Sequence, residues 1–155
     1  LNTKARLHLR ALYQKRTAFW EAIAIHREVM ILHGPTPRNE DLQMLAELQE
    51  KAGDSAEAIL TYQKLLKKQG DEHGLGALVA LARLHLELST QEPTRTLSHR
   101  KKARAYTKRA AKERATDPRV ILLQKKLGME THTPPSAFQR DLKVRGARKL
   151  SPFGD

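Results

Sequence analysis

The sequence predicts an all-α protein, and three observations lead to this fold class. The 155 residues contain 39% apolar but only 5% aromatic side chains, and Leu and Ala dominate the apolar set. These residue types favour helices, whereas a β-sandwich needs more Val, Ile, Thr and aromatic residues. Apolar residues also recur at helical spacing, in segments that end at Gly or Pro.

The first segment, residues 3–32, contains no Pro or Gly and has apolar residues at helical spacing. One long helix fits this pattern, and a pair of helices with a tight turn near residues 16–18 fits it equally well. The run Gly-Pro-Thr-Pro at residues 34–37 ends the segment because both Gly and Pro interrupt helices.

Two helices are expected next. Asn39 is a candidate N-cap for a helix that ends at Gly53. Asp54, followed three residues later by Glu57, resembles a capping box that opens the second helix. Gly70 ends this second helix.

The C-terminal half is expected to contain three more helices. A Leu- and Ala-rich helix at about residues 75–88 is followed by an expected loop at residues 89–96, which includes a proline. A basic helix then spans about residues 98–115. Asp117 followed by Pro118 is typical of a helix start, with a capping side chain and then proline at the first position.

Residues 42–66 resemble one repeat of the tetratricopeptide (TPR) family, a helix pair of about 34 residues. Gln49 departs from the pattern, because the family prefers Tyr there. A shift of 36 residues aligns Leu9, Leu45 and Leu81. The related half-a-TPR repeats of RNA-processing complexes are an alternative. The residues that match the TPR spacing are Leu42, Leu45, Ala46, Gly53, Asp54, Ala58, Ile59 and Tyr62.

The resemblance implies an α-solenoid of about three antiparallel helix pairs, the last one irregular. In such a fold the first helix of each pair lines a concave groove. Three repeats are expected, at about 3–36, 39–72 and 75–118, followed by a terminal helix at 118–128. Together they form a repeat domain of residues 1–128. Residues 129–155 are expected to be an extended basic tail.

The charge of the chain is strongly asymmetric. The net charge is +12 and the isoelectric point is about 10.2. Residues 1–94 contain 12 Lys/Arg and 12 Asp/Glu, whereas residues 95–126 contain 12 Lys/Arg and only two acids, Glu113 and Asp117. A basic coat that served only solubility would not divide so sharply, so the C-terminal part is predicted to meet a polyanion.

Two basic segments are candidates for that contact. In the basic helix, residues 101, 104, 108 and 112 follow helical spacing and form one stripe, with 102 and 109 beside it. Such a row suits a phosphate backbone, although a solvated helix face is the simpler alternative. The tail could lie along RNA or contact a neighbouring subunit, or be a disordered end. The candidate residues are Arg100, Lys101, Lys102, Arg104, Lys108, Arg109, Lys112 and Arg114 in the helix, and Arg140, Lys143, Arg145, Arg148 and Lys149 in the tail.

A third candidate site is the groove that the TPR resemblance implies. Its side chains in the second repeat form an acidic strip, which could receive a basic or mixed peptide; a plain solvated face is equally compatible. The candidate groove residues are Glu40, Gln43, Glu47, Glu50 and Arg83.

The sequence offers little for catalysis, and no metal, cofactor or small-molecule substrate is expected. The chain has no cysteine, and no two of its seven histidines have the four-residue spacing of a helical metal site. No apolar run reaches the length of about 18 residues that a membrane span needs. A soluble or peripheral protein is therefore expected; its compartment is left open, with a soluble intracellular protein or an organelle matrix as the alternatives. Residues 1–16 are basic and amphipathic, but no apolar core of a signal peptide follows them. The start at Leu1 without Met fits a removed organelle transit peptide, and it fits a trimmed or disordered start equally well.

These features predict a non-enzymatic scaffold or adaptor subunit within a larger complex. The neutral helical repeats would bind protein, and residues 95–155 would bind RNA or another polyanion, as in a ribonucleoprotein particle. The alternative is a TPR adaptor that binds only protein and whose basic end meets an acidic protein or a membrane surface.

Overall fold

The computed structural model describes residues 2–131, and in this range the chain is all-helical, with no strand. This confirms the predicted fold class. The predicted tail lies almost entirely outside the described residues. The helices are α1 (Thr3–Lys15), α2 (Phe19–His33), α3 (Asn39–Lys51), α4 (Ser55–Gln69), α5 (Leu75–Gln91), a 3-10 helix (Pro93–Arg95), α6 (Thr96–Arg114) and α7 (Pro118–Lys126).

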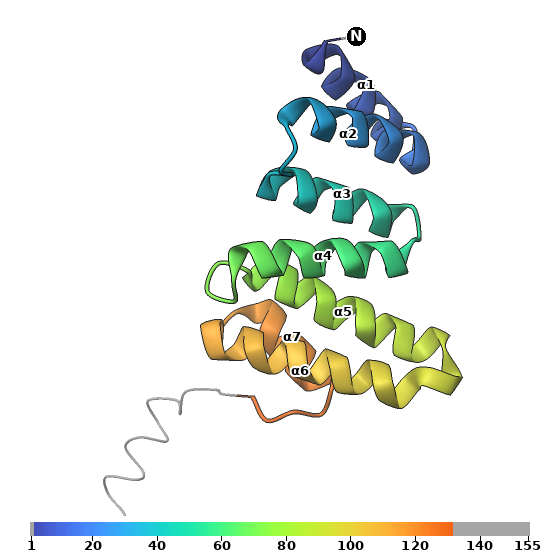
Figure 1. The fold of residues 1–155 in the computed structure, drawn as a ribbon. Helices are drawn as coiled ribbons and strands as arrows, with labels where there is room; N and C mark the ends of the chain where they lie inside the picture. Colours follow the sequence, from blue (N-terminus) through green and yellow to red (C-terminus); the bar gives the residue numbers. More distant parts are fainter. Residues whose placement is uncertain (1, 132–155) are drawn as a thin grey trace, which may run out of the picture.

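Helices that are neighbours in the chain are also neighbours in space (Figure 1). Helix α1 packs on α2, α3 on α4, and α5 on α6, while α2–α3 and α4–α5 contacts join these pairs. Helix α7 packs against both α5 and α6. The larger hydrophobic core joins α3 to α7, and a smaller one lies between α2 and α3. No helix of the described region is long and apolar enough to cross a membrane.

The N-terminal segment is a helix pair, which decides between the two alternatives that its sequence allowed. The turn lies at residues 16–18, where Thr17 has a positive φ of 58°. The amide of Ala18 donates to the carbonyl oxygen of Tyr13 at 3.0 Å, which closes the end of α1. A non-glycine residue with positive φ is uncommon, so the turn must be held by the packing of α1 on α2.

The bounds of the first two helices recur 36 residues later. Helices α1 and α3 each have 13 residues, and α2 and α4 each have 15. The turns also match, because Gly53 has a φ of 82° at the position equivalent to Thr17. Helix α5 begins at Leu75, 36 residues after Asn39, but it is longer than its counterparts. The periodicity therefore holds over four helices and the start of a fifth.

Two of the three expected N-caps are present, but the second half of the predicted capping box is not, because the amide of Asp54 donates to the carbonyl oxygen of Gln49 at 2.9 Å. The side chain of Asp54 accepts a hydrogen bond from the amide of Glu57 at 3.2 Å, and that of Asp117 accepts one from the amide of Arg119 at 2.9 Å. The prediction for Asn39 was wrong. The chain enters α3 one residue earlier, with Arg38 as the N-cap, and Oδ1 of Asn39 is buried without a hydrogen-bond partner among the described residues.

The loop expected at residues 89–96 is shorter than predicted. Helix α5 continues to Gln91, and Pro93 opens a 3-10 helix that leads directly into α6. The hydroxyls of Ser89 and Thr90 donate to carbonyl oxygens three residues earlier, at 2.6 and 2.7 Å, which keeps both side chains inside the helix. The hydroxyl of Thr96 reaches the carbonyl oxygen of Ser89 at 2.9 Å and so joins the two helix ends.

Candidate nucleic-acid interface on α6

Helix α6 has one side made of small residues that lets it lie close to its neighbours. Ala103, Thr107 and Ala110 are fully buried and recur at spacings of four and three, so they share one face. The hydroxyl of Thr107 donates to the carbonyl oxygen of Ala103 at 2.8 Å, which leaves no unpaired polar group on this face. Because the buried face is small and apolar, the long cationic side chains point to solvent.

Four of these cations form a continuous row. At 100° per residue, positions 101, 104, 108 and 112 fall within an arc of roughly 80° on the side away from the buried face. All eight candidate cations of the basic helix are exposed. The members of the row, referred to below as the α6 row, are Lys101, Arg104, Lys108 and Lys112.

The surface beside the first half of the row is hollowed. A shallow depression of about 450 Å³ is lined by cationic and apolar side chains alone, without an acid. Leu97, at the start of the helix, is 85% exposed. An anion that settles here meets positive charge and no opposing carboxylate. The lining residues are Leu97, Arg100, Lys101, Arg104, Ala105 and Lys108.

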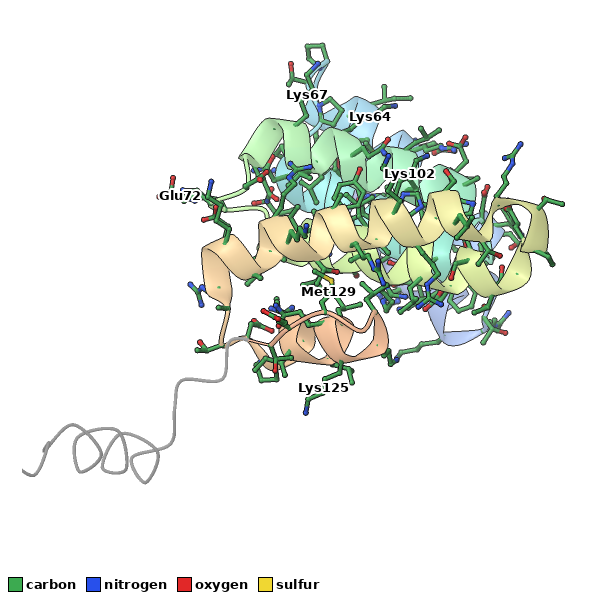
Figure 2. The ribbon with its side chains drawn as sticks, turned by 90° about the horizontal axis from the view of Figure 1, so that it is seen from below. Lys64, Lys67, Glu72, Lys102, Lys125 and Met129 are labelled. Carbon is green, nitrogen blue, oxygen red and sulfur yellow. The ribbon has the colours of Figure 1, made fainter. Side chains whose placement is uncertain are left out.

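Lys102 and Arg109 lie beside this row and are not part of it, which agrees with the helical spacing. They lie about 100° further around the helix. Figure 2, seen from below, shows Lys102 on the side of α6 that faces α4, where Lys64 and Lys67 also lie. The two flanks of α6 therefore meet different neighbours.

Arg109 holds the fold together on that second flank. Its guanidinium donates to both carboxylate oxygens of Asp71, at 2.8 and 2.5 Å, and so ties α6 to the turn between α4 and α5. The pairing lowers the pKa of Asp71 and raises the pKa of Arg109. The same guanidinium lies 5.5 Å from the ring centre of Tyr106. Arg109 is therefore already occupied within the fold.

Arg104 has a second role besides its place in the α6 row. It donates to the carbonyl oxygen of Leu127 at 3.0 Å and so caps the C-terminal end of α7. This contact places α7 beside α6. Figure 2 shows exposed Lys125 extending from α7 on the side of α6 opposite to Lys102, whereas exposed Lys126 lines a hollow between α5 and α7. These two lysines were not among the predicted site residues, although the basic composition of residues 95–126 contained the signal.

The other cations of α6 form no ion pair among residues 2–131, although Lys112 lies near enough to Asp71 to help lower the pKa of that carboxyl. The ion pairs of this range that involve α6 use only His99 and Arg109. Unpaired cations in a cluster repel each other and favour a bound polyanion. The cations of α6 that form no ion pair in this range are Arg100, Lys101, Lys102, Arg104, Lys108, Lys112 and Arg114.

The acidic strip of α3 lies along one side of the helix, as expected, but much of it is engaged within the fold. Gln43 donates to Glu47 at 2.7 Å. Glu50 accepts a hydrogen bond from the hydroxyl of Tyr62 at 2.7 Å and pairs with Arg83. Burial and this contact with Glu50 raise the pKa of Tyr62. Of the five predicted groove residues, only Glu40 has no contact of this kind with another residue of the described range 2–131.

Sequence reasoning missed a buried polar cluster between α1, α2 and α3. Asp41, which is 5% exposed, accepts hydrogen bonds from His33 at 2.9 Å and from Arg38 at 3.2 Å. Burial alone would raise the pKa of Asp41, but the hydrogen bonds and charges of His33 and Arg38 together lower it by more, so the pKa lies below its ordinary value. The sequence showed Asp41 only as a first-turn acid. No group of three or more His, Asp or Glu side chains in the described region is arranged to hold a metal ion.

The predicted tail residues lie outside the described residues: Arg140, Lys143, Arg145, Arg148 and Lys149. The geometry that bears on function is therefore that of α6 and its borders with α4 and α7.

No protein-family model matches the chain, and neither a curated protein nor a solved structure matches it significantly.

Proposed function

We propose that this protein is a non-enzymatic scaffold subunit of a macromolecular complex, in which α6 binds RNA or another polyanion and the neutral helices bind protein. One observation carries the proposal. The α6 row and the depression beside it expose cations along one side of a rigid helix, with no carboxylate among them.

The physical reason is counterion release. A polyanion condenses small cations around its phosphates, and each phosphate that meets a protein cation releases one of them to solution. A cation that is already paired with a carboxylate contributes less binding free energy, because its ion pair must be broken before it can contact a phosphate. The lysines of the α6 row form no ion pair in the described part of the chain, whereas Arg109 is paired with Asp71. The row is therefore the favoured point of contact.

The scaffold role rests on a TPR-like α-solenoid, with repeats at about 3–36, 39–72 and 75–118. The 36-residue recurrence of helix bounds and of the positive φ at Thr17 and Gly53 supports this register. Equivalent small residues also support it, because Ala22 and Ala58 are both fully buried where helices cross. Repeat scaffolds present extended surfaces and act by holding partners.

A second candidate function is favoured by the exposure of Leu97. An apolar side chain at the head of a cationic row is also suited to an anionic membrane surface or an acidic protein. In that case the protein is an adaptor that binds no nucleic acid, and ribonuclease would not change its assembly state.

Sedimentation of the tagged chain in native extract, with and without ribonuclease, tests the proposal. The variant Lys101→Glu, Lys108→Glu and Lys112→Glu reverses three charges of the α6 row. The control reverses three exposed lysines on α1 and α3, Lys4, Lys15 and Lys51, and so has the same net charge.

We expect the parent and the control to sediment with a large particle that ribonuclease disperses, and the row variant to remain light. Circular dichroism checks that both variants stay helical. If the row variant sediments like the control, the α6 row is not the site. If ribonuclease leaves a heavy particle intact, the partner is protein or membrane, and the second candidate replaces the first.

A further inference from the structure

We infer that the α6 row recognises the phosphate backbone of a double-stranded nucleic acid and discriminates against single strands. This inference rests on the proposed function and names the class of ligand for the same site. It follows from the absence of a stacking platform, the rigidity of the row and its spacing.

The outward side of α6 has no aromatic side chain. Proteins that hold single strands combine a basic groove with aromatic rings on which bases stack, each worth about 1–3 kcal/mol. The depression beside the row is lined only by Leu, Ala, Lys and Arg. A single strand would therefore make contacts between its phosphates and the cations here, but its exposed bases would find no aromatic ring on which to stack.

Tyr106, the one aromatic residue of α6, is committed elsewhere. Its ring stacks on His85 with centres 5.8 Å apart and planes 6° from parallel. Gln63 of α4 donates to its hydroxyl at 3.2 Å, and the guanidinium of Arg109 lies over the ring. It belongs to the flank that faces α4, so it offers no platform to a ligand on the α6 row.

The α6 row is held rigidly from both sides. The buried face at Ala103, Thr107 and Ala110 fixes the helix against the core. Arg104 ties it to α7 at Leu127, and Arg109 ties it to the turn after α4. A flexible single strand would lose conformational freedom in order to follow this straight row, whereas a duplex presents its phosphates already in place.

The length of the row also suits a duplex. From Lys101 to Lys112 the helix rises roughly 16 Å. Each strand of a duplex passes about five phosphates over that distance, at about 3.4 Å per step, but also turns about half-way around the axis. A straight row therefore meets the phosphates on the facing side of the duplex, from both strands where it crosses a groove, and its length suits about four such contacts. Lysine acts as a point charge and Arg104 is tied to Leu127, so the row reads no base edges and binding is independent of sequence.

Fluorescence anisotropy with the whole chain tests this. The probes are a duplex RNA of about 20 base pairs, a duplex DNA of the same sequence, and an unstructured oligouridine of the same length. We expect at least one duplex to bind roughly tenfold more tightly than the single strand, independently of sequence. The slope of log K against log salt should be near −3.6, as about four contacts require. Replacing Lys101, Lys108 and Lys112 with Gln should make the slope of log K against log salt less negative by about 2.7.

The possible failures are distinguishable. If the single strand binds as tightly as either duplex and the Gln variant weakens it, the discrimination is overturned while the proposed function stands. If no probe binds, or if the Gln variant binds all probes like the parent, both the inference and the nucleic-acid role of the α6 row are overturned. A preference between the RNA and the DNA duplex identifies the source of the phosphates and supports the inference in either direction.

Discussion

Nδ1 of His85 lies 3.0 Å from Nδ1 of His99, inside the interface between α5 and α6. With both rings neutral, one of the two nitrogens must donate. Nε2 of His99 faces a carboxylate oxygen of Glu92 at 3.4 Å, so it carries a proton, and His99 accepts at Nδ1. His85 is therefore the donor, and its Nε2 is a buried lone pair without a partner among the described residues.

This arrangement requires a neutral His85 and predicts sensitivity to acid. Burial, helped by His99 and Lys102, lowers the pKa of His85 from 6.5 to about 4. Above pH 6.5 the ring is neutral in both the folded and the unfolded chain, and stability does not depend on it. Between pH 6.5 and about 4 the unfolded chain binds the proton and the folded one does not, so the free energy of unfolding falls, by on the order of 2–3 kcal/mol.

Urea denaturation followed by circular dichroism at pH 7 and pH 4.5 measures this loss. The variant His85→Phe keeps a ring beside Tyr106 but cannot bind a proton. It should be less stable than the parent at pH 7, because His99 loses its partner, and should lose less stability on acidification. Equal losses in the parent and the variant would show that other groups cause the acid sensitivity.

A second histidine joins the first three helices and predicts a loss of stability on substitution. Arg10 can only donate, so its 2.8 Å contact makes Nδ1 of His26 an acceptor, and Nε2 of His26 donates to the carbonyl oxygen of Asp41 at 2.9 Å. Replacing His26, which is 1% exposed, with Phe leaves the Arg10 guanidinium and the Asp41 carbonyl unpaired. We expect a loss of roughly 2–4 kcal/mol in the free energy of unfolding.

The exposed His8 on α1 provides the matched control. His8→Phe should change the free energy of unfolding by no more than about 0.5 kcal/mol. Both variants are compared with the parent by urea denaturation at pH 7. A small effect of His26→Phe would mean that the chain of contacts from Arg10 to Asp41 adds nothing to stability.

Local signals explain which parts of the fold were predictable. Asp117 with Pro118, and the glycine and two prolines at 34–37, act within one turn of the chain, so their effects can be read from neighbouring residues. The end of α5 was not predicted, because the hydroxyls of Ser89 and Thr90 bond back to the helix instead of ending it. Polar side chains have both options, and packing against α6 decides between them.

The same distinction applies to the candidate site. The α6 row follows from the 3.6-residue period of a single helix, so its members were predictable. Which helix lies beside each flank depends on contacts between distant residues, such as Arg109 with Asp71, which are 38 positions apart. The helical period separates Arg109 from Lys108, but it does not show that Arg109 is paired with Asp71. The neighbours of the two flanks therefore needed the structure.

The buried face of α6 predicts a steric limit. Ala103 is fully buried, whereas Ala105, two residues later on the same helix, is exposed. Ala103→Leu should lower the free energy of unfolding by about 1–3 kcal/mol, because the interface has no room for three more carbons. Ala105→Leu should change it by less than about 0.5 kcal/mol. The urea concentrations at the unfolding midpoints of the two variants test this prediction. Equal midpoints would contradict the close packing of α6.

Lys108 and Arg109 are adjacent in the chain, but their substitution is expected to have opposite effects on binding and on stability. Each substitution by Gln removes one positive charge. Lys108→Gln should weaken binding to duplex nucleic acid and make its salt dependence shallower by about 0.9, with little change in stability, because Lys108 lies in the α6 row. Arg109→Gln should leave the salt dependence unchanged and lower the free energy of unfolding by up to about 1 kcal/mol, because it removes the partly exposed pair with Asp71. Anisotropy titrations at several salt concentrations and urea denaturation give the two readouts. If both variants weaken binding equally, net charge and not the α6 row governs the interaction.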